Sequence, residues 1–254
     1  MSFPRFTDRA VLVTGAGSGL GRAIALAFAA EGARVAVAGR AAAPLDETVA
    51  LIEAAGGTAR AFTADVAVAE DTRRLVRDTV AAFGGLDVAV NNAGVFRGGH
   101  LAGDFPLEDW RTLLDINVTG VLHALQAEIA HMRAHGGGAI VNIASNLGAH
   151  VRVPGLFGYQ VSKAAVSAIT RAAALDHVAD GIRINAVSPG AAESSMSLRP
   201  GETEADRAVR MKEESPLGRI SSAAEIAAAV LYLASDAAGS AVGTDLVIDG
   251  GVSA

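Results

Sequence analysis

Short apolar segments alternate along the chain with longer segments in which apolar residues recur at helical spacing. Most of the short segments lack polar alternation, as expected for strands that helices cover on both faces. A helix is predicted after Gly19, where Leu20, Ile24 and Phe28 share one face, and a longer helix over 106–134. Strands are predicted at 11–13, 35–38, 59–64, 86–90, 139–144, 183–187 and 246–248. This order predicts an α/β fold with a doubly wound, seven-stranded parallel sheet.

The length of 254 residues favours one domain spanning 1–254. One segment, 191–216, breaks the alternation of strands and helices. It is rich in Ser, Glu, Arg and Met and lies between the sixth strand and the last helix. A long irregular insertion in a compact domain is usually functional, so we expect this segment to form a lid over a ligand.

Composition narrows the class of protein further. Hydrophobic residues make up 51% of the chain and the net charge is −6, without a block of basic residues, which argues against nucleic acid or an anionic membrane as the main partner. The absence of cysteine excludes disulfides and thiolate metal sites. The N-terminus lacks a signal-peptide core, and no apolar run approaches the roughly 18 residues of a membrane-spanning helix. We therefore expect a soluble, cytoplasmic protein.

A glycine-rich turn follows the first predicted strand and leads directly into a helix. Its spacing is T-G-x-x-x-G-x-G rather than G-x-G-x-x-G. Glycines at such a turn let backbone N–H groups approach a pyrophosphate, which the helix N-terminus also attracts. The alternative is a glycine-rich turn without a ligand. The turn consists of Thr14, Gly15, Ala16, Gly17, Ser18, Gly19, Leu20 and Gly21.

Polar residues gather at the carboxyl ends of other predicted strands, where open α/β sheets bind their ligands. Asn91, Asn92, Ala93 and Gly94 end the fourth strand, Ser145 ends the fifth, and Asn117 lies in the long helix. Tyr159 and Lys163 are four residues apart and therefore share a helix face. A nearby ammonium favours the phenolate, so Lys163 is expected to draw the pKa of Tyr159 toward neutrality.

This combination resembles the short-chain dehydrogenase/reductase family over nearly the whole chain, including 185–190 and 249–251. The resemblance implies a Rossmann-type fold and a nicotinamide cofactor. Tyr159 would exchange a proton with the substrate oxygen and Ser145 would hydrogen-bond it. Lys163 would also bind the nicotinamide ribose, and Asn117 would hold a water linking Lys163 to solvent.

The resemblance also implies a set of cofactor contacts, in which Asp65 touches the adenine; a capping role for Asp65 stays open. After the second predicted strand stands Arg40 instead of the Asp or Glu that NAD enzymes place there, which favours the 2′-phosphate of NADP. A solvated Arg40 with mixed cofactor use is the alternative. The contacts are Thr14, Gly15, Gly17, Ser18, Gly19, Leu20, Gly21, Arg40, Asp65, Val66, Asn92, Ala93, Gly94, Tyr159, Lys163, Pro189, Gly190 and Ser194.

The chain departs from the family pattern at two places. Fourteen residues separate Ser145 from Tyr159, one more than usual, so the loop 146–158 is expected to bulge. Ser194 stands where the family often has threonine, and its hydroxyl is expected to contact the carboxamide.

Several other residues invite two interpretations. His131 and His135 have zinc-pair spacing without a third ligand, so a solvated helix end explains them better and no metal is expected. His150 and Arg152 would meet an anionic substrate or lie exposed. Trp110 is expected to pack between helices. An apolar substrate wall or ordinary packing would explain Leu147, Val151, Phe157 and Met196.

The sequence thus predicts an NADP-preferring oxidoreductase that interconverts a secondary alcohol and a ketone. The alternatives are an NAD-dependent dehydrogenase, a 3-oxoacyl-carrier-protein reductase, or a cofactor-binding sensor without catalysis. The expected partners are a small-molecule substrate and further copies of the chain, as a homotetramer or dimer that packs through the helices at 106–134 and 158–178.

Overall fold

A computed structural model of the protein describes residues 4–254 and confirms the seven predicted strands, with ends that shift by a few residues. Their small and branched side chains are mostly buried, because helices lie on both sides of the sheet. The strands are β1 Ala10–Thr14, β2 Arg34–Gly39, β3 Thr58–Thr63, β4 Val88–Asn91, β5 Gly138–Ile143, β6 Ile182–Pro189 and β7 Asp245–Ile248.

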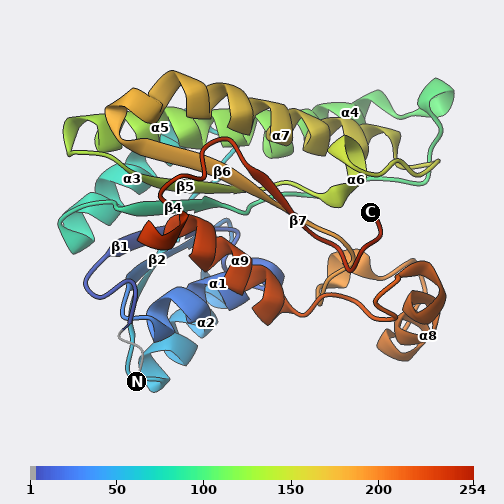
Figure 1. The fold of residues 1–254 in the computed structure, drawn as a ribbon, viewed down its shortest axis with the longest axis horizontal. Coiled ribbons are helices and arrows are strands. Elements are labelled where there is room, and N and C mark those ends of the chain that lie inside the picture. Colours follow the sequence, from blue (N-terminus) through green and yellow to red (C-terminus); the bar gives the residue numbers. More distant parts are fainter. Residues whose placement is uncertain (1–3) are drawn as a thin grey trace.

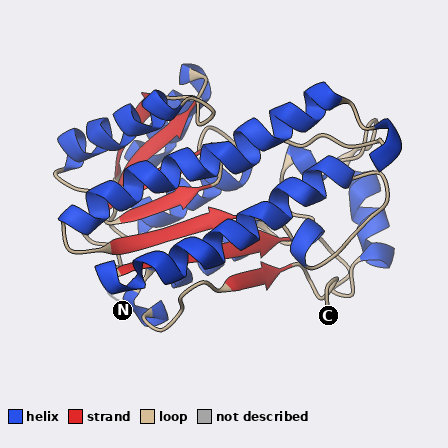
Figure 2. Cartoon of the chain, turned by 90° about the horizontal axis from the view of Figure 1, so that it is seen from above, coloured by secondary structure: helices blue, strands red, loops and turns tan. Residues whose placement is uncertain are grey.

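All strand pairs are parallel, in the order β3-β2-β1-β4-β5-β6-β7. The strand order reverses between β1 and β4, and Figure 2 shows the strand arrows pointing the same way. In such sheets a crevice opens beyond the carboxyl ends of the strands at this switch point. The glycine turn after β1 and the segment 91–94 after β4 therefore share one edge of the sheet.

Two layers of helices enclose the sheet and create two apolar cores. Val11 and Val13 of β1 face one core, and Leu12 faces the other, as the alternation of a strand requires. One layer contains α1 Gly19–Ala30, α2 Ala42–Ala54 and α9 Ala223–Ala234. The other contains α3 Ala69–Phe83, α4 Leu107–Leu113, α5 Gly120–Ala134 and α7 Phe157–His177 (Figure 1).

Two predicted segments differ from the structure. The helix expected over 106–134 is interrupted by a π-helical turn, η2 Leu114–Thr119, which contains Asn117. The segment 191–216 is not wholly irregular, because it contains α8 Glu204–Glu214. Thr203 and Asp206 form a reciprocal capping box that begins this helix.

The remaining elements are short. They are α6 Asn146–Ala149 and the 3-10 turns η1 Ala102–Asp104, η3 Val178–Asp180, η4 Ser195–Ser197 and η5 Asp236–Ala238. Within residues 4–254, none of the helices has the length and apolar character that crossing a membrane would require.

Candidate active site

The glycine turn leaves the N-terminus of α1 open to an anion. Ser18 begins the helix without a side-chain cap, and the first turn carries no acidic residue. Gly15 adopts a φ of +65°, in the left-handed region that favours glycine. A Cβ on Gly21 would collide with the Gly15 carbonyl oxygen, so only glycine fits there. This cradle suits the diphosphate of a dinucleotide.

Thr14 joins the glycine turn to the end of β4. Its hydroxyl accepts hydrogen bonds from the backbone N–H groups of Asn92 and Ala93, each at 3.1 Å. The Asn92 side-chain amide in turn donates to the Thr14 carbonyl at 2.9 Å. These bonds hold the two loops that border the switch-point crevice in one arrangement.

Asn117 fixes the next stretch of chain. Its side-chain oxygen accepts from the Val95 N–H at 2.8 Å, and its amide donates to the Val95 carbonyl at 2.9 Å and to the Ser162 hydroxyl at 3.0 Å. A Cβ on Gly94 would lie 3.2 Å from the Asn117 side-chain oxygen and 3.4 Å from the Lys163 ammonium. The residues after β4 thus lie directly against Asn117 and Lys163.

Ser145, Tyr159 and Lys163 come together at the carboxyl end of β5. The Ser145 hydroxyl accepts from the Leu147 N–H at 3.1 Å and lies close enough to the Tyr159 hydroxyl to favour its phenolate. The Lys163 ammonium donates to the Ile143 carbonyl at 2.8 Å. Tyr159 and Lys163 are 7% and 6% exposed, so both are held in place within the protein.

The expected lowering of the Tyr159 pKa is wrong. Burial raises the pKa of Tyr159 to about 12, and the Ser145 hydroxyl only partly opposes this. Burial also lowers the pKa of Lys163 to about 8. Loss of water around the phenol sets the direction of this shift, and the Lys163 ammonium, which donates to the Ile143 carbonyl, does not offset it.

Two side chains of the predicted lid segment reach this site. The Met196 sulfur lies 3.9 Å from the Tyr159 hydroxyl oxygen. The Ser194 Cβ lies 3.7 Å from where a Cβ on Gly19 would stand, so Ser194 lies against the glycine turn. Sequence reasoning missed Phe96, whose ring centroid is 5.0 Å from that of Tyr159. Its position just after Asn91–Gly94 was the available signal.

Some of the residues predicted to bind the adenosine half of the cofactor also form hydrogen bonds within the protein. Arg40 is exposed directly after β2, and within residues 4–254 it forms no ion pair. The Asp65 carboxylate accepts from the Ala67 N–H at 3.0 Å, in the turn before α3. The N-cap of α3 is Val68, without a side-chain cap, so the capping role considered for Asp65 is wrong. The Val66 carbonyl lies 3.1 Å from the His123 ring nitrogen Nδ1.

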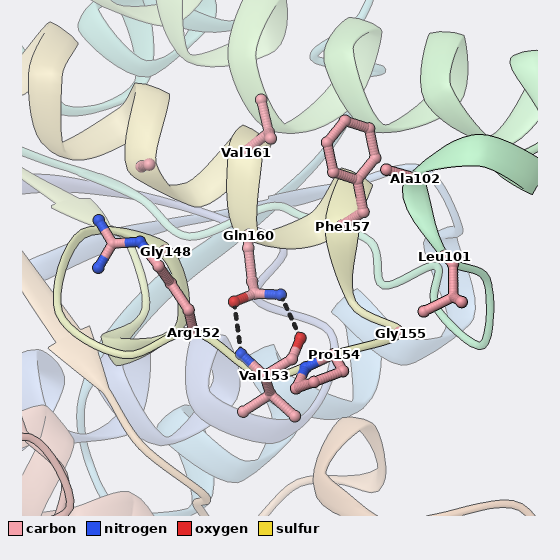
Figure 3. Close-up of a pocket in the computed structure, with 11 residues that line it drawn as sticks. Leu101, Ala102, Gly148, Arg152, Val153, Pro154, Gly155, Phe157, Gln160 and Val161 are labelled. Atoms are coloured by element: carbon pink, nitrogen blue, oxygen red, sulfur yellow. Dashed lines mark hydrogen bonds between the residues drawn. The ribbon is translucent and has the colours of Figure 1, made fainter.

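Figure 3 shows a pocket of about 580 Å³ beside the N-terminal part of α7. Phe157, Gln160 and Val161 line it, whereas Tyr159 and Lys163 are buried residues of the same helix. Gln160 joins this pocket to the loop before α7 by two hydrogen bonds with the Val153 backbone, of 2.7 and 2.8 Å. The pocket therefore does not coincide with the Ser145–Tyr159 site.

Phe157 is not part of a wall beside Tyr159. Its ring stacks on Trp110 at 5.8 Å and meets Phe105 edge-on, also at 5.8 Å. The expected packing of Trp110 between helices is thereby confirmed.

The histidines have roles that the sequence did not specify. His150 neither lies free in its loop nor faces a substrate, since its Nε2 is 3.0 Å from the Asp245 carboxylate. Asp245 also accepts from the hydroxyls of Ser167 in α7 and Ser188 in β6, at 2.6 and 2.5 Å. Through Asp245, the loop 146–158 that contains His150 is anchored to α7 and β6. The His131 and His135 rings stack with centroids 4.0 Å apart.

A buried carboxyl, Glu128, lies behind the site and gives a stability prediction. Asn91 donates to it at 3.1 Å, and its Oε1 has no partner among the described residues. Burial raises its pKa to about 7 from 4.5, so its contribution to stability is full below pH 4.5 and is lost as the pH rises through 7. A shift of this size corresponds to about 3 kcal/mol.

The unfolded carboxyl is already mostly ionised at pH 5, so part of the effect is present there. We therefore expect Glu128→Gln to raise the free energy of unfolding, relative to the unsubstituted protein, by about 2 kcal/mol more at pH 8 than at pH 5. Urea unfolding at the two pH values measures the difference. Glu53→Gln, at an exposed position of α2, is the control. An effect of Glu128→Gln that is the same at both pH values would contradict the prediction.

Comparison with known proteins agrees with this geometry. A family model described as enoyl-(acyl carrier protein) reductase matches residues 15–253. The chain is 42% identical over 251 residues to a 2,5-dichloro-2,5-cyclohexadiene-1,4-diol dehydrogenase of Sphingobium indicum, which covers 98% of each chain. It is 36% identical to the cyclohexanol dehydrogenase of an Acinetobacter strain, covering 97% of this chain and 95% of the relative.

Solved structures extend the comparison. Levodione reductase superposes with a TM-score of 0.92 at 35% identity, covering 98% of this chain and 99% of that one. A 7α-hydroxysteroid dehydrogenase in complex with NADH superposes with a TM-score of 0.91 at 31% identity, covering 98% and 96%. The fold and relatives define an oxidoreductase that acts on CH–OH groups with a nicotinamide cofactor. The chain belongs to the short-chain dehydrogenase/reductase family.

Proposed function

We propose that the protein is an NADP(H)-preferring oxidoreductase that interconverts a cyclic secondary alcohol and its ketone. The observation that carries the proposal is the assembly of Ser145, Tyr159 and Lys163 at the carboxyl end of β5, beside the glycine turn and the segment 91–94. A sensor without catalysis has no need of this arrangement.

The side chains have separate roles in this proposal. Tyr159 gives a proton to the substrate oxygen during reduction and takes it back during oxidation. Ser145 hydrogen-bonds the same oxygen. When bound, a nicotinamide cofactor would supply or accept the hydride, and the positive charge of its oxidised form would favour the Tyr159 phenolate. Asn117 keeps the Val95 backbone and Ser162 in place around Lys163.

The residues proposed to bind the dinucleotide lie at the carboxyl ends of the strands around the switch point between β1 and β4. The glycine turn would hold the diphosphate, the segment 92–94 and Lys163 the nicotinamide half, and Asp65 and Val66 the adenine half. Pro189, Gly190 and Ser194 would complete the nicotinamide pocket. The preference for NADP rests on the exposed guanidinium of Arg40 at the end of β2, where no carboxylate would repel a 2′-phosphate.

A cyclic substrate is supported by two observations. Phe96 and Met196 flank Tyr159 with apolar surfaces. Several relatives are named for hydroxylated six-membered rings, including cyclohexanol and cis-4-hydroxycyclohexanecarboxylate. We also propose that the protein is a cytoplasmic homo-oligomer. The oligomer is supported by apolar side chains that α5 and α7 expose, such as Leu122, Val161 and Leu175.

Nicotinamide absorbance with a panel of substrates tests the function. We expect NADP-linked oxidation of cyclohexanols at least about tenfold faster, as kcat/KM, than that of linear secondary alcohols. Sugars, steroids and 3-oxoacyl thioesters complete the panel. Turnover confined to 3-oxoacyl thioesters would replace the proposal with a carrier-protein reductase. Tight NADPH binding without turnover would favour the sensor.

A further inference from the structure

One face of α8 is built around a buried cation. Arg207 and Met211, one helical turn apart, are its buried residues, and Arg207 is only 6% exposed. A buried guanidinium is normally paired with a carboxylate. Across residues 4–254, no ion pair involves Arg207, whereas the neighbouring Arg210 pairs with Glu202 and Glu214.

Arg207 instead donates to the turn that precedes α8. Its Nη1 lies 3.0 Å from the Ser194 carbonyl oxygen and 2.8 Å from the Ser197 hydroxyl oxygen. The Ser197 hydroxyl reaches the carbonyls of Ala192, at 2.7 Å, and Ser194, at 2.9 Å. One guanidinium nitrogen thus joins α8 to a network of hydrogen bonds that holds the turn 194–197.

The same turn touches both halves of the proposed site. Ser194 lies against Gly19 of the glycine turn, and the Met196 sulfur lies 3.9 Å from the Tyr159 hydroxyl oxygen. A displaced turn would therefore change the surface that meets the cofactor and the wall beside the substrate oxygen. Misplacing such positioning groups by about 1 Å can cost a large factor in rate.

We propose that Arg207 is a positioning residue for the reaction, which fixes the turn 194–197 between the glycine turn and Tyr159. This rests on the proposed function of the site. Both acceptors in the turn are served by one nitrogen at the far end of the guanidinium. A lysine ammonium keeps the charge and can also donate to two acceptors, but it ends a side chain that is one atom shorter, so Arg207→Lys should recover only part of what Arg207→Met loses.

The test measures NADPH affinity by the fluorescence of the bound cofactor, and backbone hydrogen exchange, in the full-length protein. For Arg207→Met we expect the NADPH dissociation constant to rise about tenfold, which is the size of one lost charged hydrogen bond. Exchange should accelerate in 191–202 and stay unchanged in β5 and β6. With a cyclohexanol, KM should rise more than kcat falls. Lys212→Met, exposed on the same helix, should leave every value unchanged.

Ser197→Ala is the milder variant, because it removes an acceptor of Arg207 without touching the buried charge. It should weaken NADPH binding less than Arg207→Met, and the double variant should be no worse than Arg207→Met alone. Unchanged affinity and exchange in both single variants would overturn the proposal. The proposal would also fail if Arg207→Met accelerated hydrogen exchange in β5 and β6 as much as in 191–202 while Ser197→Ala had no effect. Binding and exchange need no turnover, so failure of the proposed reaction is seen separately.

Discussion

Replacing Tyr159 by Phe is expected to lower kcat for alcohol oxidation and ketone reduction by about 10³-fold, within the range for loss of a general acid–base group. The ring keeps its buried place against Phe96, and only the hydroxyl that meets Ser145 is lost. The NADPH dissociation constant should therefore change less than threefold, which corresponds to about 0.5 kcal/mol, the size expected where no specific contact is lost. Steady-state kinetics and a cofactor titration on the same preparation measure the two quantities.

Tyr232→Phe is the matched control, since it removes the chain's other phenol, which is exposed near the end of α9. It should leave kcat unchanged. Turnover retained by Tyr159→Phe would remove Tyr159 from the proposed proton transfer. A loss of turnover and cofactor binding together would show that the variant disturbs the site's packing instead.

Much of the fold follows from short apolar strands that alternate with helical segments. The seven strands and their parallel orientation were predicted from apolar segments that lack polar alternation and alternate with helical segments, a pattern that is present in the residues themselves. The convergence of Ser145, Tyr159 and Lys163 was also predictable, because strand ends and helix periodicity place them at one edge of the sheet.

Features that depend on three-dimensional packing were harder to predict from the sequence. The π-helical turn at Asn117 disrupts a pattern that reads as one continuous helix. Helix α8 was overlooked although Thr203 and Asp206 form a capping box, because its exposed sequence carries few apolar residues. The pKa of Tyr159 depends on burial, which residue spacing does not report.

The partners of single polar side chains were the least predictable. His150 and Asp245 are 95 residues apart in the chain, and Arg207 meets a turn rather than an acidic residue. Neither pairing has a local signature, since each is created by the docking of separate elements. Residues in the lid segment therefore acquire their roles only when the site is assembled around them.

The second large expected effect is a change of cofactor preference on substitution of Arg40. Replacing Arg40 by Asp should remove a charge-assisted contact to the 2′-phosphate and add a repulsive carboxylate that can accept hydrogen bonds from a ribose. We expect the ratio of kcat/KM for NADP to that for NAD to fall about 100-fold, since hydrogen bonds to charged groups contribute roughly 1.5–3 kcal/mol. Kinetics with each cofactor at one fixed alcohol concentration measure this ratio.

Arg60→Asp makes the same change of charge at an exposed arginine of β3 and serves as the control for long-range electrostatics. At physiological ionic strength, charges separated by more than about 8 Å of solvent are largely screened, so this variant should shift the ratio only slightly. Equal shifts in both variants would attribute the preference to net charge. An unchanged ratio in Arg40→Asp would mean that Arg40 is solvated and that the cofactor's 2′ position is recognised elsewhere.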